Sequence, residues 1–333
     1  MSPRGVSKQN SVQIKDVAKH AGVSTATVSR VINGASVKPD LRIAVERSVK
    51  KLGYEPNRQA RSLRKQRSEL IALIVPDIEN PFFNALARGV EDVTQAVGFS
   101  IVLCNSDEDS KKEDKYLTIA KSTGMAGVII APATTSPRID QLISEGRAVV
   151  TIDRTVTCHV DSVTFDNFAL GASGASDLIE RGYKRIACIT GPSTASTAND
   201  RADGWASELR KKGLTTKGLL KTANFRVDGG RAAAQELMAM DNPPDAILAT
   251  NNLVGVGVLQ ALDQLNKTKV GVTVIGDLPF ASASSENAHT IPLDPRSIGE
   301  QAARMLLERI NGLKVPPRKV VQGVTGPRLL SWD

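Results

Sequence analysis

The sequence predicts a small all-α helix-turn-helix headpiece followed by an α/β core of two doubly wound parallel-sheet subdomains. Three observations support this fold class. The first 67 residues carry a large excess of basic side chains, three short amphipathic helical patterns lie between residues 12 and 53, and apolar strand-like runs alternate with amphipathic helices from residue 70 onward. With 333 residues, the chain is long enough for two or three packed domains.

Basic side chains are concentrated at the N-terminus. Residues 1–67 contain 15 Lys and Arg against 4 Asp and Glu, a net charge of +11, whereas the remaining residues contain 28 against 31, a net charge of −3. The basic residues interleave with an apolar period instead of forming a run, which argues against the alternative of a solvated tail. A basic module beside a slightly acidic domain is typical of a protein that docks on phosphates.

Other bulk features exclude several classes of protein. No apolar run reaches the roughly 18 residues that a membrane span needs, and no apolar segment follows the basic residues at the start of the chain. We therefore expect a cytoplasmic protein that does not associate with a membrane. Cys104, Cys158 and Cys188 lie in mostly apolar stretches without CxxC spacing. These features predict small buried thiols rather than a disulfide or a metal site, and we expect no cofactor.

Three helical patterns define the headpiece. Each has inward apolar residues at helical spacing and a turn residue where it ends. Ser24 can cap the second helix, because its side-chain oxygen can accept a hydrogen bond from an early backbone N–H group. The patterns with their end signals are Ile14–Ala21 with Gly22, Ser24–Ile32 with Asn33-Gly34, and a helix after Pro39-Asp40 with Gly53.

The second helix has the composition expected of a helix that enters the major groove of DNA. Thr25, Ala26 and Thr27 are slim enough for the backbone to approach base edges. Arg30 can reach O6 and N7 of a guanine. An ordinary surface helix would explain the inward valines but not the basic excess around it. The side chains suited to phosphate or base hydrogen bonds are Ser24, Thr27, Ser29 and Asn33.

The segments IKDVAKHAGVSTATVSRVING (14–34) and VERSVKKLGYEPNRQARSL (45–63) closely resemble the DNA-binding headpiece of the lactose-repressor (LacI/GalR) family. The resemblance implies that the segment after the third helix, here Asn57 to Arg64, is a hinge helix, which folds only on the operator and pushes a leucine, here Leu63, into the minor groove. The arginines that would flank this leucine are Arg58, Arg61 and Arg64.

The residues of this segment agree with that role. Asn57 can cap a helix in which Ala60 and Leu63 share one face, and the helix is too short to be stable alone. An apolar wedge between base steps gives such an arrangement a physical purpose. A plain basic linker is the alternative. The predicted DNA contacts are Ile14, Ser24, Thr25, Ala26, Thr27, Ser29, Arg30, Asn33, Tyr54, Asn57, Arg58, Ala60, Arg61 and Leu63.

Strand-like runs and helical patterns alternate over residues 70–132, and the alternation recurs over residues 184–276. This pattern predicts two similar parallel-sheet subdomains with a ligand site in the cleft between them. The whole portion resembles the effector-binding core of the same family, which has the fold of type I periplasmic binding proteins. The expected domains are 12–56 (helix-turn-helix), 57–67 (hinge) and 68–333 (core), the core being divided into 68–166 plus a late return segment and 167–290.

Ligand-binding side chains in such sheets come from loops at the carboxyl ends of strands. Asp153-Arg154 follow the run VVTI and can exchange paired hydrogen bonds with adjacent hydroxyls, while Phe82 or Phe83 can stack on a sugar ring. Alternatively, the phenylalanines belong to the core and Asp153-Arg154 form a surface ion pair. The predicted effector contacts are Asn80, Phe82, Phe83, Asp153, Arg154, Arg201, Phe225, Asn251 and Asp277.

The resemblance implies a site most similar to a ribose site, through NPFF, Asp153-Arg154 and Phe225. The chain departs from the family pattern in the C-terminal half of this site. Asn252 stands where Asp is usual, Leu293 stands where Gln is common, and the loop GDLPFAS around Asp277 is shorter. We therefore expect a less polar half-pocket, and a ligand other than ribose stays open.

An enzymatic function is not expected. The chain has only three histidines, His20, His159 and His289, and His20 is expected to face solvent. No nucleophile, base and orienter stand out together. GASGAS (171–176) is not G-x-S-x-G, GVGVLQ (255–260) lacks the third glycine of a dinucleotide fingerprint, and no P-loop is present.

The sequence therefore predicts a homodimeric transcriptional repressor that binds a palindromic double-stranded operator and responds to a small carbohydrate effector, with the pentose class favoured. The alternatives are a regulator controlled by a protein partner or by no effector, and an architectural DNA binder, which would not need a polar cleft. The chain stops at LLSWD without a heptad tail, so we expect a dimer rather than a tetramer.

Overall fold

The computed structural model describes residues 12–32, 35–54, 68–133, 137–278 and 287–329. The chain divides into two compact units, one ending at Ser68 and the other beginning at Glu69. We refer to residues 12–54 as the headpiece and to residues 69–329 as the core.

Three helices and one small apolar cluster make up the headpiece. The helices are α1 (Ile14–Ala21), α2 (Thr25–Ile32) and α3 (Pro39–Leu52). Val17, Val28 and Val45 come from different helices and are fully buried together. Ser24 Oγ accepts a hydrogen bond from the backbone N–H of Thr27 at 3.1 Å. The three predicted helices and the Ser24 cap are therefore confirmed.

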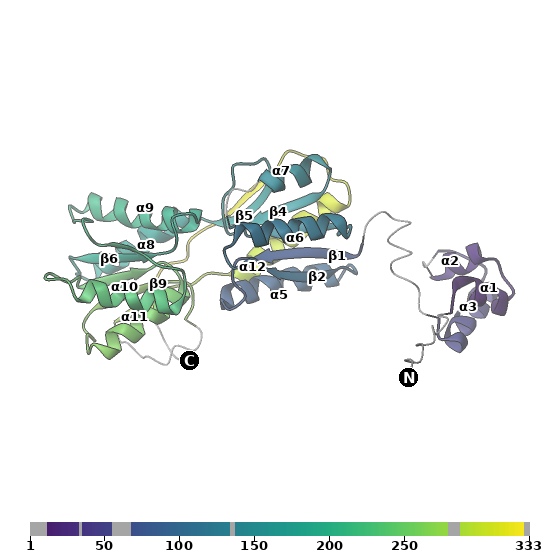
Figure 1. Ribbon diagram of the computed structural model, residues 1–333, viewed down its shortest axis with the longest axis horizontal. Coiled ribbons are helices and arrows are strands. Elements are labelled where there is room, and N and C mark those ends of the chain that lie inside the picture. The colour runs from purple at the N-terminus through teal and green to yellow at the C-terminus, as the bar shows by residue number, and fades with distance from the viewer. Residues whose placement is uncertain (1–11, 33–34, 55–67, 134–136, 279–286, 330–333) are drawn as a thin grey trace, which may run out of the picture. The chain divides into compact units, whose positions relative to one another are not determined.

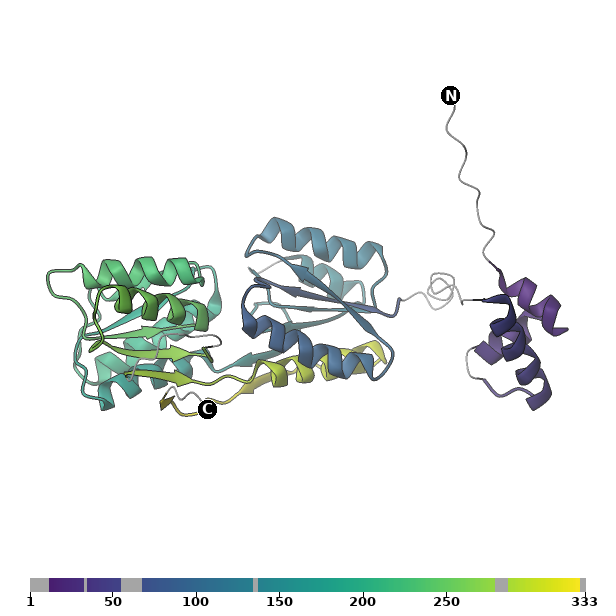
Figure 2. The ribbon, with the colours of Figure 1, turned by 90° about the horizontal axis from the view of Figure 1, so that it is seen from below.

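The first lobe of the core is a six-stranded parallel sheet. Its elements are β1 (Leu70–Val75), α5 (Pro81–Gln95), β2 (Ser100–Asn105), α6 (Ser110–Ser122), β3 (Gly127–Ile130), α7 (Pro137–Ser144), β4 (Ala148–Ile152), β5 (Asp161–Phe165), α12 (Pro295–Ile310) and β11 (Lys319–Gln322). The strand order is β11-β5-β4-β3-β1-β2. Helices α5 and α12 cover one face and α6 and α7 cover the other (Figure 2).

Strand β1 shows why these strands are continuously apolar. Leu73 and Val75 pack with residues of α5 and α12, whereas Ala72 and Ile74 pack with residues of α6 and α7. Both faces of the sheet are covered, so successive side chains along the strand must all be apolar. The unbroken run LIALIV in the sequence follows from this burial on both faces.

The second lobe repeats this design. Its elements are α8 (Asn167–Glu180), β6 (Ile186–Thr190), α9 (Ser196–Lys211), β7 (Leu220–Thr222), α10 (Val227–Met238), β8 (Ala246–Ala249), α11 (Asn252–Gln264), β9 (Gly271–Ile275), β10 (Ala288–Ile291) and β12 (Arg328–Leu329). The strand order is β12-β10-β9-β8-β6-β7, and only β12 of these strands runs antiparallel to its neighbour. Helices α8 and α9 lie on one face and α10 and α11 on the other (Figure 1).

The late return segment consists of α12 and β11, which follow the second lobe in sequence but complete the first. Asp161 of β5 anchors this segment. Its carboxylate accepts hydrogen bonds from Nε and Nη2 of Arg309, both at 2.8 Å, and from the backbone N–H of Arg318 at 2.7 Å. The chain therefore passes between the lobes after β5, β10 and β11, and these crossings hold the two lobes side by side.

Some helices differ from the sequence expectation. The segment LTIAKSTG (117–124) predicts one of the helices of the first lobe, but α6 begins earlier, at Ser110, because Asp109 caps it by accepting the backbone N–H of Lys111 at 2.8 Å. Helix α8 is not among the helices expected from the sequence, and its GASGAS segment is rich in glycine. A Cβ on Gly171 would lie 1.9 Å from the carbonyl oxygen of Arg201, so this glycine lets α8 contact α9 backbone to backbone.

Other expectations about single residues can also be compared with the structure. Cys104 and Cys188 are buried as predicted, whereas Cys158 is partly exposed, and all three thiols are free. His20 is exposed as predicted, with Nδ1 lying 2.9 Å from Ser48 Oγ. In the described ranges, no helix is long and apolar enough to cross a bilayer, and no group of three or more His, Cys, Asp or Glu residues could hold a metal ion.

Candidate functional site

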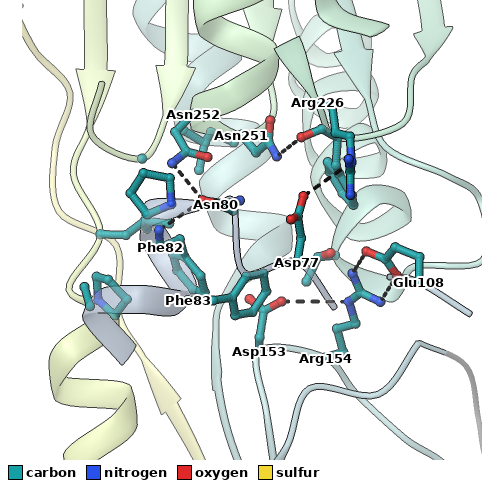
Figure 3. Close-up of a pocket in the computed structure, with 18 of the residues that line it drawn as sticks. Asp77, Asn80, Phe82, Phe83, Glu108, Asp153, Arg154, Arg226, Asn251 and Asn252 are labelled. Atoms are coloured by element: carbon teal, nitrogen blue, oxygen red, sulfur yellow. Dashed lines mark hydrogen bonds and ion pairs between the residues drawn. The ribbon is translucent and has the colours of Figure 1, made fainter. Parts of the chain in front are cut away.

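A cavity of about 470 Å³ lies in the core and is lined by both lobes (Figure 3). Its walls are loops at the carboxyl ends of the strands, which is where ligand sites occur in open parallel sheets. The volume is ordinary for a small-molecule site. All nine predicted effector contacts line it, namely Asn80, Phe82, Phe83, Asp153, Arg154, Arg201, Phe225, Asn251 and Asp277.

Asn80 caps α5 and connects the two lobes. Its Oδ1 accepts the backbone N–H of Phe82 at 3.0 Å and the side-chain amide of Asn252, from the start of α11, also at 3.0 Å. Because Oδ1 already accepts twice, Asn80 can offer a ligand only its own N–H groups. Asn252 was not among the predicted contacts, although its position directly after a strand end could have indicated it.

The two phenylalanines form an apolar wall of fixed orientation. Their rings are 5.0 Å apart in an edge-to-face arrangement with an interplanar angle of 85°. Phe83 is buried in the core cluster, and Phe82 packs against the same cluster with its ring 6.2 Å from that of Phe165. Since both also line the cavity, a core role and a cavity role coincide here rather than competing.

Asp153 and Arg154 are buried, with exposed fractions of 6% and 4%, so the alternative of a surface ion pair is wrong. Arg154 donates from Nη1 and Nη2 to the two carboxylate oxygens of Glu108, at 2.7 and 2.5 Å. Burial raises the pKa of Asp153, and the nearby Arg154 and Arg201 oppose this shift. Glu108 was missed from the sequence, although it follows β2 in the acidic run DED, where the strand-end rule also applies.

Arg201 is held rigidly in α9. Its Nε donates to Asn167 Oδ1 at 2.8 Å and its Nη1 donates to the carbonyl oxygen of Thr250 at 2.6 Å. Burial lowers the pKa of this guanidinium, and Asp153 opposes the shift. The two hydrogen bonds and the close contact of α9 with Gly171 place the guanidinium at the cavity wall.

Phe225 closes another side of the cavity. Its backbone is left-handed at φ 61°, and its ring lies so close to Gly191 that a Cβ there would be 2.2 Å from the ring. Asn251 donates from Nδ2 to the carbonyl oxygen of Phe225 at 3.0 Å, while its Oδ1 accepts the backbone N–H of Val254 at 2.8 Å. Asn251 therefore supports the loop of Phe225 and has less to offer a ligand than the sequence suggested.

Asp277 lies at the less polar end of the cavity. Its side chain is 55% exposed, and its carboxylate lies 3.2 Å from Arg328 Nη2. Ile275 and Leu293 line the same end. This composition agrees with the lower polarity expected from the departures at Leu293 and Asp277, and the Asp277 carboxylate is engaged by Arg328 at the surface.

A second contact joins the two lobes at the cavity (Figure 3). Arg226 Nε lies 3.4 Å from Asp77 Oδ2, and Arg226 Nη1 lies 3.5 Å from Glu79 Oε2. Arg226 is partly exposed, so each of these ion pairs contributes at most about 1 kcal/mol. Their pairing across the two lobes is not visible in the sequence.

Helix α2 carries five of the eight predicted DNA contacts that the structure describes, while its Val28 and Val31 face the headpiece cluster. The exposed members are Ser24, Thr25, Ala26 and Arg30, and the partly exposed members are Thr27, Ser29, Ile14 and Tyr54. A polar, slim surface with one long cation therefore faces outward from α2. The predicted contacts Asn33, Asn57, Arg58, Ala60, Arg61 and Leu63 lie outside the described residues.

Known proteins resemble this chain along most of its length. Residues 13–57 match the family of bacterial regulatory proteins, lacI family, and residues 68–322 match the periplasmic binding proteins and sugar binding domain of the LacI family. The chain is 37% identical over 298 residues to the ribose operon repressor of Bacillus subtilis, covering 88% of this chain and 90% of that protein. It is 32% identical over 327 residues to the ribose operon repressor of Halalkalibacterium halodurans, covering 94% and 96%.

A solved structure agrees with the fold. The lac repressor dimer bound to operator and the anti-inducer ONPF superimposes with a TM-score of 0.85 at 22% identity, covering 95% of this chain and 97% of that chain. At this identity the likeness concerns the fold alone. The family matches and the identities above 30% carry the assignment: this chain belongs to the LacI family of bacterial regulatory proteins.

Proposed function

We propose that this chain is a sequence-specific DNA-binding repressor whose operator affinity is modulated by a small sugar of the ribose class, bound in the cavity of the core. The ribose class is favoured because the two relatives described above are ribose operon repressors. The observation that carries the effector assignment is the buried pair Asp153 and Arg154 at the wall of a cavity with aromatic side chains. An acceptor and a donor beside aromatic rings suit a polyhydroxylated ring.

On the DNA side, a homodimer would bind a palindromic operator with each α2 in a major groove. Arg30 would read a guanine, and the hydroxyl side chains of α2 would bind phosphates or bases. Residues 57–67 would form the hinge, with Leu63 as the minor-groove wedge. The exposure of Arg30 and of the first turn of α2 supports this arrangement.

The effector would act by shifting a population of states. The contacts that join the lobes at the cavity, Asn80 with Asn252 and Arg226 with Asp77, are the ones that a bound sugar would reinforce. A changed position of the first lobes across the dimer would then alter whether the two hinges pair on DNA. By linkage, operator DNA must change the affinity for the sugar by the same factor.

The melting temperature of the full chain in the presence of pentoses, hexoses, their phosphates and nucleosides tests the effector assignment. A ligand that binds only the folded chain stabilises it by about 2.7 kcal/mol at a concentration of 100 times Kd. We expect a ribose-class sugar to raise the melting temperature, and Asp153→Ala to abolish this rise. No rise with any of these compounds would favour the alternative, a DNA-binding regulator controlled by a protein partner or without an effector. We propose no enzymatic step for this chain and place its action in the cytoplasm.

A further inference from the structure

Glu108 binds both terminal nitrogens of the Arg154 guanidinium group. Both carboxylate oxygens accept from Arg154, and Nη1 also donates to the carbonyl oxygen of Pro132 at 3.1 Å. A bidentate pair of this kind fixes the plane of the guanidinium as well as compensating its charge. This end-on face is the one that pairs with a phosphate in many binding sites, and here Glu108 already occupies it.

The remaining donor edge of Arg154 faces Asp153. Arg154 Nε is buried without a hydrogen-bond partner in the described part of the chain, and it lies 3.9 Å from Asp153 Oδ2. That distance is too long for a direct hydrogen bond. A hydroxyl oxygen placed between the two groups can accept from Nε and donate to Asp153. A fully ionised phosphate oxygen can accept from Nε, but it has no proton to donate and would be repelled by the carboxylate.

The other cations of the cavity are engaged as well. Arg201 donates to Asn167 and Thr250, and Arg226 lies beside Asp77 and Glu79. Carboxylates also outnumber guanidinium groups, which disfavours a dianionic ligand. The ionisable lining residues are Asp77, Asp107, Glu108, Asp153, Asp277, Arg154, Arg201 and Arg226.

We propose that Glu108 is a positioning residue that makes this cavity selective for a neutral sugar over its phosphate ester. The inference rests on the proposed function, because it refines which form of the sugar is sensed. Glu108 acts through Arg154: it occupies the end-on face of the guanidinium and directs the Nε–H edge toward Asp153. Without Glu108, the guanidinium is free to present its end-on face to a phosphate group.

Isothermal titration calorimetry of the full chain with D-ribose and with D-ribose 5-phosphate tests this role. We expect the wild type to bind ribose at least about 100-fold more tightly than its phosphate. Glu108→Gln keeps the shape of the side chain but removes its charge, and should narrow this ratio by about tenfold or more. Glu145→Gln is the matched control, since it makes the same substitution at an exposed residue of the first lobe that is bonded to Lys121 and does not line the cavity. In this control, the ratio of the affinities for ribose and for ribose 5-phosphate should change by less than about threefold.

A second variant separates geometry from charge. Glu108→Asp keeps the charge, but its side chain is one methylene shorter and holds the carboxylate farther from the two terminal nitrogens of Arg154, so it should weaken ribose binding by about tenfold. The melting temperatures of the unliganded variants show whether each is folded.

Three results would overturn parts of this account, and they differ from one another. Equal changes of this affinity ratio in Glu108→Gln and Glu145→Gln would overturn the positioning role, because the loss of one negative charge anywhere on the core would then explain them. Wild-type binding of the phosphate ester as tight as that of ribose would overturn the selectivity and leave the sugar site standing. No binding of either compound by the wild type would overturn the ribose-class function itself, and the inference with it.

Discussion

Replacing Glu113 by Gln should remove a pH dependence from the stability of the core. Glu113 is fully buried in α6, where Oε2 accepts the backbone N–H of Ala133 at 2.6 Å and Oε1 has no hydrogen-bond partner within the described residues. Burial raises the pKa of this carboxyl from 4.5 to about 7, although the hydrogen bond from Ala133 opposes the shift. The preceding residue, Pro132, is an acceptor of Arg154, so Glu113 supports the cavity wall from behind.

The direction of the effect follows from proton linkage. The folded-state pKa is the higher one, so between about pH 4.5 and pH 7 the folded chain holds a proton that the unfolded chain has lost. The free energy of unfolding therefore falls as the pH rises through this window. Each pKa unit corresponds to about 1.4 kcal/mol, so a rise from 4.5 to about 7 destabilises the ionised state by on the order of 3 kcal/mol. A Gln side chain can still accept from Ala133, but it does not ionise.

Urea unfolding at pH 5 and pH 8, followed by the fluorescence of the buried Trp205, measures this effect. Between these pH values the wild type should lose about 2.5 kcal/mol more stability than Glu113→Gln, because part of the linkage has already developed at pH 5. Glu236→Gln removes a carboxylate that is 64% exposed on α10, and it should follow the wild type. Parallel pH profiles for the wild type and Glu113→Gln would refute the reasoning.

Arg30→Ala should lower the discrimination between the operator and a mutated operator by about 1 to 3 kcal/mol, because a bidentate guanine contact carries sequence information. Nonspecific DNA binding should remain. DNA titrations that show unchanged specificity would contradict the assignment. Leu63→Ala should reduce operator bending measured by energy transfer, and unaltered bending would remove the wedge model. Gly171→Ala should destabilise the core by about 2 kcal/mol or more and weaken sugar binding, because its Cβ would press on Arg201. Wild-type stability and affinity in this variant would show that α8 and α9 can separate freely.

The strands of the core are predictable because covered sheets make them continuously apolar, as β1 shows. Helix α8 is less predictable, because glycine lowers the intrinsic preference for a helix. In the fold, Gly171 and Gly174 are where the backbone of α9 and the side chain of Leu248 approach α8. These glycines stabilise the fold through close contacts between α8 and other elements. The sequence pattern within one segment does not reveal such contacts.

The site shows the same division between what a local pattern reveals and what the fold adds. The strand-end rule finds Asp153 and Arg154, because it depends only on where an apolar run stops. It does not show that Asn251 is engaged by Phe225, nor that Glu108 binds Arg154 from 46 residues away. Local patterns therefore indicate which side chains surround the cavity, whereas the hydrogen-bonding capacity left for a ligand depends on long-range pairs.

The backbone around the cavity explains how these side chains are kept in place. Asp107, Glu108, Asp153 and Phe225 all line it with a left-handed backbone, and Asn266 is the only other non-glycine residue in the described ranges with a positive φ. Each such conformation costs on the order of 1 to 2 kcal/mol and persists only where the surrounding structure imposes it.

Backbone hydrogen bonds hold two of these residues, Asp153 and Phe225, in the left-handed conformation. The N–H of Asp153 donates to the carbonyl oxygen of Val163 at 3.0 Å, and Asn251 donates to the carbonyl oxygen of Phe225. Because folding already orders these side chains, a ligand loses little affinity in ordering them and must instead match their positions. The proposed selectivity for a sugar over its phosphate ester requires this kind of preorganisation, and four of the five non-glycine residues with a positive φ in the described ranges line this one cavity.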